Sequence, residues 1–262
     1  MKRLLLILLL ACVPGRVWGA WASASDLGVA ADKVAGTSIT MTNANTVEVN
    51  NVILVVVAVD NASASDGDNN EVTGVVDGAS NTYVQAREFT NAQTGAATGA
   101  TVAVFFSKVT TQLSASSTIT ANLSSSITAK AISAWEFTIT STNVVTVEAG
   151  TDEAADGADL GSLDLSVANA EYLWVRGAAR ESSTVANITA TTNFSTISRA
   201  TTGGGASATN MGVRGERRIF TGTSNASNPT SESVDHASVY VALKESVAAA
   251  NATPIRRPIV LQ

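Results

Sequence analysis

Val52-Ile53-Leu54-Val55-Val56-Val57-Ala58-Val59 is an unbroken apolar run that directly follows the polar pair Asn50-Asn51. Most of its side chains are β-branched, which favours extended backbone. The run also lacks the alternation of apolar and polar residues that marks a strand with one face in water. It therefore predicts a central β-strand covered on both faces, and it is the strongest candidate for the centre of the core.

Short runs rich in Val, Ile, Thr, Phe and Tyr recur between residues 36 and 245, and clusters of Gly, Asn, Asp, Ser and Ala separate them. No credible amphipathic helix lies between these runs, so the chain lacks the alternation of strand and helix that builds parallel sheets. The other expected strands are 38–42, 72–77, 82–89, 101–109, 117–123, 126–139, 144–148, 162–167, 171–176, 211–220 and 237–244. We predict an all-β fold of about a dozen strands, arranged as a two-sheet antiparallel β-sandwich.

The length of 262 residues fits one large β domain, and no second domain boundary interrupts the strand pattern. We expect residues 23–245 to form a single sandwich domain. After Glu245 the chain becomes rich in Ala and then carries Pro254 and Pro258, which argue against a closing central strand. Residues 246–262 are therefore predicted to be a C-terminal tail.

The N-terminus has the features of a secretory signal peptide. A positively charged start, Met1-Lys2-Arg3, precedes the apolar run from Leu4 to Val13, which is about half of the ~20 residues that a membrane-spanning helix needs. Cleavage after Gly19 and cleavage after Ala22 both fit the preference for small residues at the cut, so both stay open. We predict that residues 1–22 are a signal peptide, that the protein is secreted or at the cell surface, and that it has no transmembrane segment.

A competing interpretation is a lipoprotein signal, because Leu9-Leu10-Ala11-Cys12 resembles a bacterial lipobox in which Cys12 would carry the lipid. If the signal peptide is removed instead, the mature chain contains no cysteine. Such a chain must hold its fold without disulfides, through burial and β pairing.

Composition excludes several classes of function. Hydrophobic residues make up 45% of the chain and charged residues 15%, and 16 Lys and Arg against 22 Asp and Glu give a formal net charge of -6. No excess of cations is present to neutralise a phosphate backbone, so nucleic acid is not an expected partner. One His and one Cys are too few for a zinc cluster or a Cys-His nucleophile pair. His236 follows Asp235, but the chain has no G-x-S-x-G elbow that this histidine could serve.

Several segments are distinctive when taken together. They are Trp21 with Leu27-Gly28, Val55 to Asn61, Val72 to Asp77, Asn81-Thr82-Tyr83, Ala129 to Phe137, and Val239 to Glu245. They resemble an uncharacterised all-β domain of tailed-phage structural proteins and secreted bacterial proteins. The resemblance covers most of the mature chain, and each motif is a strand or turn pattern with little chemical content. It implies a jelly-roll-like sandwich used for surface attachment or structure, and it transfers no catalytic residue.

The densest group of oxygen ligands is Asp60 with Asp66, Asp68, Asn70 and Glu71. Calcium takes six to eight such oxygens from a flexible loop, so this is the best candidate metal site. An EF-hand is excluded, because Glu71 stands where that loop requires Gly. The alternative is a solvated acidic turn in which Asp and Asn cap the backbone. A second acidic loop, residues 152–159, is a weaker candidate of the same kind.

Tyr172 and Trp174 share one face of an expected strand with Arg176, an arrangement suited to stacking on a sugar ring. In the alternative interpretation these aromatic residues belong to the core. Glu88 and Glu136 are the candidate carboxylate pair of a glycosidase, and the alternative for both is an outward-facing charge on a strand. A further strand puts charged side chains on one face, which predicts a solvated edge with ion pairs across strands; they are Arg214, Glu216 and Arg218.

These observations favour a non-enzymatic secreted or particle-surface protein that acts in structure or adhesion through the surface of its β-sandwich, with possible self-association. Uncharged strand faces rich in Thr, Ser and Asn suit repeated contacts to a partner. The alternative function is a carbohydrate-binding module with a calcium-stabilised loop that recognises a surface glycan. A glycosidase that uses a carboxylate pair is the third.

Overall fold

The computed structural model describes residues 21–92, 99–140, 142–182, 188–206, 209–230 and 233–247. These residues form strands joined by turns and loops, with no α-helix among them. The strands are β1 (Ala22–Asp32), β2 (Gly36–Thr42), β3 (Val52–Asp60), β4 (Val72–Asp77), β5 (Val84–Asn91), β6 (Ala100–Lys108), β7 (Thr118–Ile127), β8 (Lys130–Thr138), β9 (Asn143–Ala158), β10 (Leu163–Arg180), β11 (Ser195–Thr196), β12 (Ala200–Thr201), β13 (Gly212–Ser227) and β14 (Val234–Val247). The predicted all-β class is confirmed.

The first eight strands wind in the nested order of a jelly roll. One sheet has the order β1-β8-β3-β6-β5, and a smaller sheet has the order β2-β7-β4. The pairs β1 with β8, β2 with β7, and β3 with β6 are antiparallel and lie one inside the next along the sequence. We call the two sheets the middle sheet and the small sheet.

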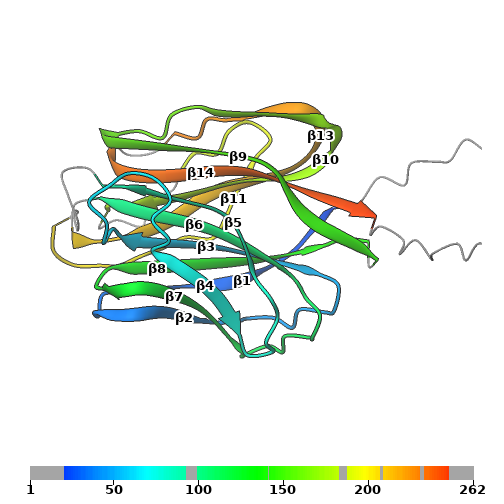
Figure 1. Ribbon diagram of the computed structural model, residues 1–262, viewed down its shortest axis with the longest axis horizontal. Helices are drawn as coiled ribbons and strands as arrows, with labels where there is room; N and C mark the ends of the chain where they lie inside the picture. Colours follow the sequence, from blue (N-terminus) through cyan, green and yellow to red (C-terminus); the bar gives the residue numbers. More distant parts are fainter. Residues whose placement is uncertain are drawn as a thin grey trace, which may run out of the picture.

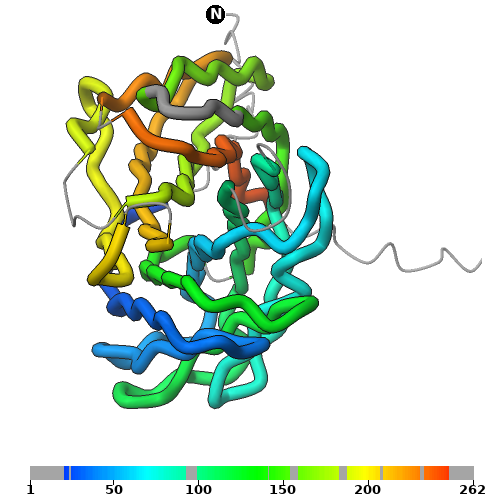
Figure 2. Tube along the Cα trace, turned by 90° about the vertical axis from the view of Figure 1, so that its left-hand side faces the viewer, coloured from blue at the N-terminus to red at the C-terminus, as the bar shows by residue number. Residues whose placement is uncertain are grey.

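The last six strands form a third sheet, the outer sheet, in the order β11-β13-β10-β14-β9, with β12 also paired to β13. Figure 1 shows three stacked layers, with the outer sheet above the middle sheet and the small sheet below it. From the side, the yellow to red segments of the outer sheet again lie opposite the blue β2 (Figure 2). All sheets are antiparallel and pack against each other as expected, but there are three of them where two were predicted.

Two separate cores lie on the two faces of the middle sheet. Leu54 and Val56 of β3 pack toward the outer sheet, where they join a cluster that includes residues of β10 and β14. Ile53, Val55 and Val57 point the opposite way and join the apolar residues of the small sheet. Every residue from Val52 to Val59 is buried. The prediction that this strand is covered on both faces is therefore confirmed.

Several strand boundaries differ from the predicted ones. Residues 126–139 were expected to form one strand, but β7 ends at Ile127 and β8 begins at Lys130. Residues 152–159 were expected to be an acidic loop, yet most of them continue β9, which pairs with β14 along its length. The predicted strands 162–167 and 171–176 are parts of the single strand β10, which has a bulge between Ser166 and Ala170.

The predicted signal peptide lies almost entirely outside the described residues, apart from Trp21 and Ala22. Of the predicted tail, Ser246 and Val247 belong to β14, and the remainder also lies outside. Within the described ranges, no helix is long and apolar enough to cross a membrane.

Candidate functional site

The acidic loop between β3 and β4 directs its carboxylates toward backbone N–H groups. Glu71 is buried; its Oε1 accepts hydrogen bonds from the N–H groups of Ala62 and Ser63, and its Oε2 accepts one from the Thr101 hydroxyl at 2.6 Å. Asp66 Oδ1 accepts the Ala92 N–H at 2.8 Å. These contacts tie the loop to β6 and to the end of β5.

Asp68 and Asn70 make the same kind of contact, whereas Asp60 Oδ1 is buried with no hydrogen-bond partner among the described residues. Asp68 Oδ1 accepts the Asn70 N–H at 3.1 Å, and Asn70 has a positive φ of 52°, as residues in tight turns do. The pKa of Asp60 is raised to about 6 by burial and by the nearby charge of Glu71. In the part of the chain that the structure describes, no three His, Cys, Asp or Glu side chains come together in a way that could hold a metal ion. The structure therefore lends the expected calcium site no support. Hydrogen bonds from backbone N–H groups engage Asp66, Asp68 and Glu71, although Glu71 is buried rather than solvated.

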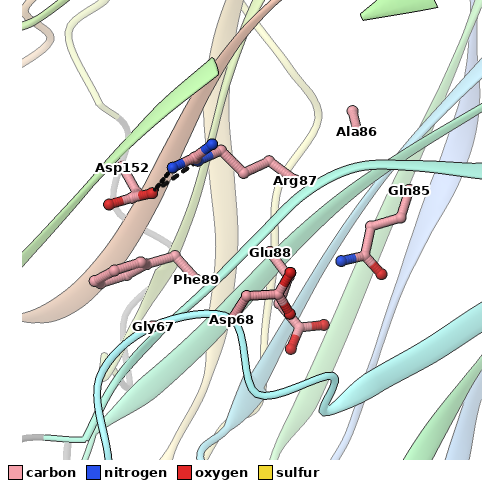
Figure 3. A pocket seen from close by; sticks show the side chains of 8 residues that line it. All are labelled: Gly67, Asp68, Gln85, Ala86, Arg87, Glu88, Phe89 and Asp152. Atoms are coloured by element: carbon pink, nitrogen blue, oxygen red, sulfur yellow. Dashed lines mark hydrogen bonds and ion pairs between the residues drawn. The ribbon is translucent and has the colours of Figure 1, made fainter. Parts of the chain in front are cut away.

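A polar cleft of about 450 Å³ lies beside this loop, between β5 and β9. Gly67 and Asp68 of the loop line it on one side, and side chains of β5, including Glu88 and Phe89, line it on the other. Arg87 and Asp152 form an ion pair across the cleft, which Figure 3 shows as dashed lines. This pair links the edge of the middle sheet to the edge of the outer sheet.

Glu88 is a buried carboxyl of this cleft. Burial raises its pKa to about 7, and the charge of Asp68, drawn beside it in Figure 3, acts in the same direction. Both carboxyl oxygens are engaged: Oε1 accepts the Glu71 N–H at 2.7 Å and Oε2 accepts the Val72 N–H at 3.0 Å. Glu88 is 2% exposed, so its first role is to anchor the start of β4 to β5.

The expected carboxylate pair is not brought together. Glu136 lies on β8, where it accepts hydrogen bonds from Ser25 Oγ and Asn51 Nδ2, both at 2.6 Å. Three strand spacings separate β8 from β5 in the middle sheet. At ~4.8 Å each, this puts the two strands about 14 Å apart, beyond the ~9.5 Å limit for paired carboxylates in glycosidases. Neither Glu88 nor Glu136 is the outward-facing charge of the alternative interpretation, since both are buried.

The expected sugar-stacking residues lie in the interior. Tyr172, Trp174 and Arg176 are all 0% exposed. Trp174 packs edge-on against Tyr172 and at a tilt against Tyr240, with ring centroids 5.4 and 5.9 Å apart. This aromatic cluster also contains Phe194, from the segment before β11. The expectation of an exposed platform is wrong, because chain segments outside the strand pattern cover this face of the outer sheet.

The same cover buries charged residues that the sequence placed in solvent. Arg176 donates to the backbone oxygens of Gly161 and Ser227 and forms an ion pair with Glu153. Glu216, at 0% exposed, accepts hydrogen bonds from the Thr191 backbone N–H and hydroxyl and from the Ser227 hydroxyl. Arg214 is also buried. Arg218, the third residue of the predicted solvated edge, is partly exposed and lies over the Phe220 ring, 4.1 Å from its centroid. The predicted solvated edge is therefore mostly buried. No alternation in the sequence distinguishes a strand face in water from one covered by a loop.

The small sheet turns one uncharged face to solvent. Its inward residues, such as Ile39, Met41 and Ile119, are buried against the middle sheet, so their neighbours point outward. In register, the outward residues form the rows Ser38-Asn122-Gly74, Thr40-Thr120-Val76 and Thr42-Thr118. We call these eight residues the hydroxyl face. None of them is charged, and Val76 is 50% exposed.

The hydroxyl face follows from a pattern visible in the sequence. Ser38-Ile39-Thr40-Met41-Thr42 and Thr118-Ile119-Thr120-Ala121-Asn122 both alternate a small polar residue with an apolar one. Such alternation places every polar side chain on one face of the sheet. The Oγ1 atoms of Thr40 and Thr120 are 2.9 Å apart, so the hydroxyls of neighbouring strands hydrogen-bond to each other.

Comparisons with known proteins returned no match: no family model, no curated protein and no solved structure is similar to this chain. The fold is thus established by the structure itself, as an all-β protein with antiparallel sheets. The resemblance to phage and secreted bacterial domains stays a prediction.

Proposed function

We propose that this protein is a secreted, non-enzymatic adhesion protein that attaches to a neutral polysaccharide through the hydroxyl face. The observation that carries the proposal is the charge-free array of hydroxyl, amide and small side chains on the small sheet. The chain as a whole has 38 charged side chains, 16 basic and 22 acidic, yet none of them lies on this face. Solvent-exposed sheet faces usually carry charges, which keep them soluble and unpartnered.

The chemistry of the face fits a neutral, hydroxyl-bearing partner. Thr and Ser hydroxyls both donate and accept hydrogen bonds, and the Asn122 amide adds two donors and an acceptor. Thr methyl groups and Val76 supply apolar contact of the kind that the carbon-bound faces of sugar rings need. An acidic polysaccharide would meet no cation here. The polar cleft is a poorer place for a sugar, because both carboxyl oxygens of its Glu88 are already hydrogen-bonded to backbone.

The size of the face favours a repeating partner over a second copy of the chain. Three strands at ~4.8 Å spacing and five residues at ~3.3 Å each give an area of about 250 Å². A stable protein interface needs about 800 Å² from each partner. A contact this small becomes effective when many copies of the protein are carried on one cell or particle and bind one extended polysaccharide, because the second and later contacts then form at high effective concentration.

The test is a pull-down of the mature protein on insoluble cellulose, chitin and starch. Thr40→Lys places a cation in the middle row of the face, and burying that unpaired charge should weaken binding by at least about tenfold. Thr223→Lys makes the same charge change on an exposed part of β13 in the outer sheet, and it should bind as the native protein does. The proposal is overturned if none of the three polysaccharides retains the protein, or if Thr40→Lys binds as strongly as the control.

A further inference from the structure

Trp21, which precedes the first strand, is a residue of the core. It is 5% exposed and belongs to the cluster between the middle and outer sheets. Its ring meets Phe137 of β8 edge-on, with centroids 6.2 Å apart and the planes at 81°. Its backbone N–H donates to Glu171 Oε1 of β10 at 2.8 Å. The residue therefore joins two sheets at once.

The pairing of β1 begins immediately after Trp21. Ala22 pairs with Thr138 and Ser23 pairs with Phe137, so the peptide bond between Ala22 and Ser23 lies inside the ladder of the middle sheet. The bond between Gly19 and Ala20 precedes the first strand residue in the sequence. The two candidate signal-cleavage sites thus have opposite consequences, because only cleavage after Gly19 leaves Trp21 in the mature protein.

We propose that signal peptidase cleaves this chain after Gly19, so that the mature protein begins at Ala20; this inference rests on the proposed secretion. In the hydrolysis, the C–N bond between Gly19 and Ala20 breaks, the hydroxyl of water goes to the Gly19 carbonyl carbon, and its hydrogen goes to the Ala20 nitrogen. Gly19 supplies the small residue required just before the cut, and Val17 stands two residues earlier, where the later site has Ala20.

Two further features favour this bond. It lies three residues nearer to the end of the apolar run, Val13, than the bond after Ala22 does. Cleavage at Gly19 also leaves a positively charged amino group one residue before the N–H that bonds the Glu171 carboxylate. Cleavage after Ala22 would instead remove the Trp21 ring from the core, together with the first paired residue of β1.

The test expresses the full chain in a bacterium that exports it and reads the N-terminus of the exported protein by sequencing and intact mass. An N-terminus at Ala20 supports the inference. An N-terminus at Ser23 overturns it while leaving secretion intact. A lipid-modified N-terminus at Cys12 also overturns it. An uncleaved chain retained in the cytoplasm overturns both this inference and the proposed secretion.

Three variants separate processing from folding. Ala22→Leu blocks only the later site, and because Ala22 is exposed the variant should be exported with the native Ala20 N-terminus and an unchanged Tm. Gly19→Leu should yield an uncleaved chain, or a chain cut after Ala22 with a lower Tm. Trp21→Ala should keep the Ala20 N-terminus and lower the Tm by several degrees. A chain beginning at Ser23 with the native Tm would contradict the role given to Trp21.

Discussion

Gly177 of β10 lies where the outer sheet comes into close contact with the middle sheet, and replacing it tests the three-layer packing. A Cβ atom added there would lie 2.8 Å from Val56 Cγ1 and 3.0 Å from Val104 Cγ2. Ordinary carbon–carbon contacts are about 3.5–4.0 Å, so Gly177→Ala must move the sheets apart or turn two valines out of their preferred rotamers. Valine side chains are stiff at χ1, which makes the rotamer change costly, and moving the sheets apart would open voids in a close-packed core.

The expected magnitude follows from two opposing effects. Overpacking of this kind costs about 1–3 kcal/mol, and the loss of glycine's flexibility in the unfolded chain returns about 0.4–1 kcal/mol. The net loss is about 1–2 kcal/mol, which for a domain of this size lowers the Tm by about 2–8 °C. Gly177→Val should lower it further, because each added methyl meets the same neighbours.

The assay is thermal unfolding followed by circular dichroism, with Gly74→Ala as the matched control. Gly74 is also a strand glycine, but an added Cβ would meet nothing within 4 Å. This control should therefore unfold at or slightly above the native Tm. A Gly177→Ala protein that unfolds at the same temperature as the control would refute the close contact between the two sheets.

Three other predictions address the polar interior. Glu88 has a pKa of about 7 in the fold against 4.5 in the unfolded chain, so the fold holds an extra proton between these values. Its contribution to the free energy of unfolding should therefore fall as pH rises through that window. Urea titrations should find that the free energy of unfolding of Glu88→Gln, relative to that of the native protein, is higher at pH 8 than at pH 5. Equal differences at both pH values would contradict this. Arg176→Met should cost about 3–5 kcal/mol in urea unfolding because it breaks a buried ion pair, whereas Arg87→Met breaks a partly exposed pair and should cost at most about 1 kcal/mol; similar losses would refute the burial of Arg176. Millimolar calcium or EDTA should leave the Tm unchanged, because the Glu71 carboxylate is already bonded to backbone and to Thr101; a rise with calcium would restore the metal site.

Strands whose pattern is set by the core were predictable from the sequence. The range of β4 matches the prediction, and the run from Val52 to Val59 is buried on both faces as its composition indicated. Burial on both faces implies that another sheet packs on each side of this strand. An apolar run does not indicate which strands of the chain form those sheets. β9 to β14 carry no local signal that assigns them to a sheet of their own.

The candidate site residues were less predictable, because exposure depends on chain segments far away in the sequence. Trp174 of β10 and Glu216 of β13 lie on one face of the outer sheet. The segment that contains Thr191 and Phe194 covers this face. That segment has no periodic pattern to indicate where it packs. The alternation around Thr40 and Thr120 placed the hydroxyls on one face of the small sheet, and that face is solvent-exposed because no further element among the described residues covers it.

The nested pairing of the jelly roll also sets the order in which the chain can fold. Strand β3 has β6 and β8 as its neighbours and β1 has β8, so both strands lack a complete set of native partners until residue 138 has been synthesised or exported. Until β6 is complete at Lys108, Val52 to Val59 is an uncharged, β-branched segment with no partner at all, the kind of sequence that pairs with copies of itself. Long-range pairing of this kind is also slow. The yield of native protein should therefore depend on keeping nascent chains apart during that interval.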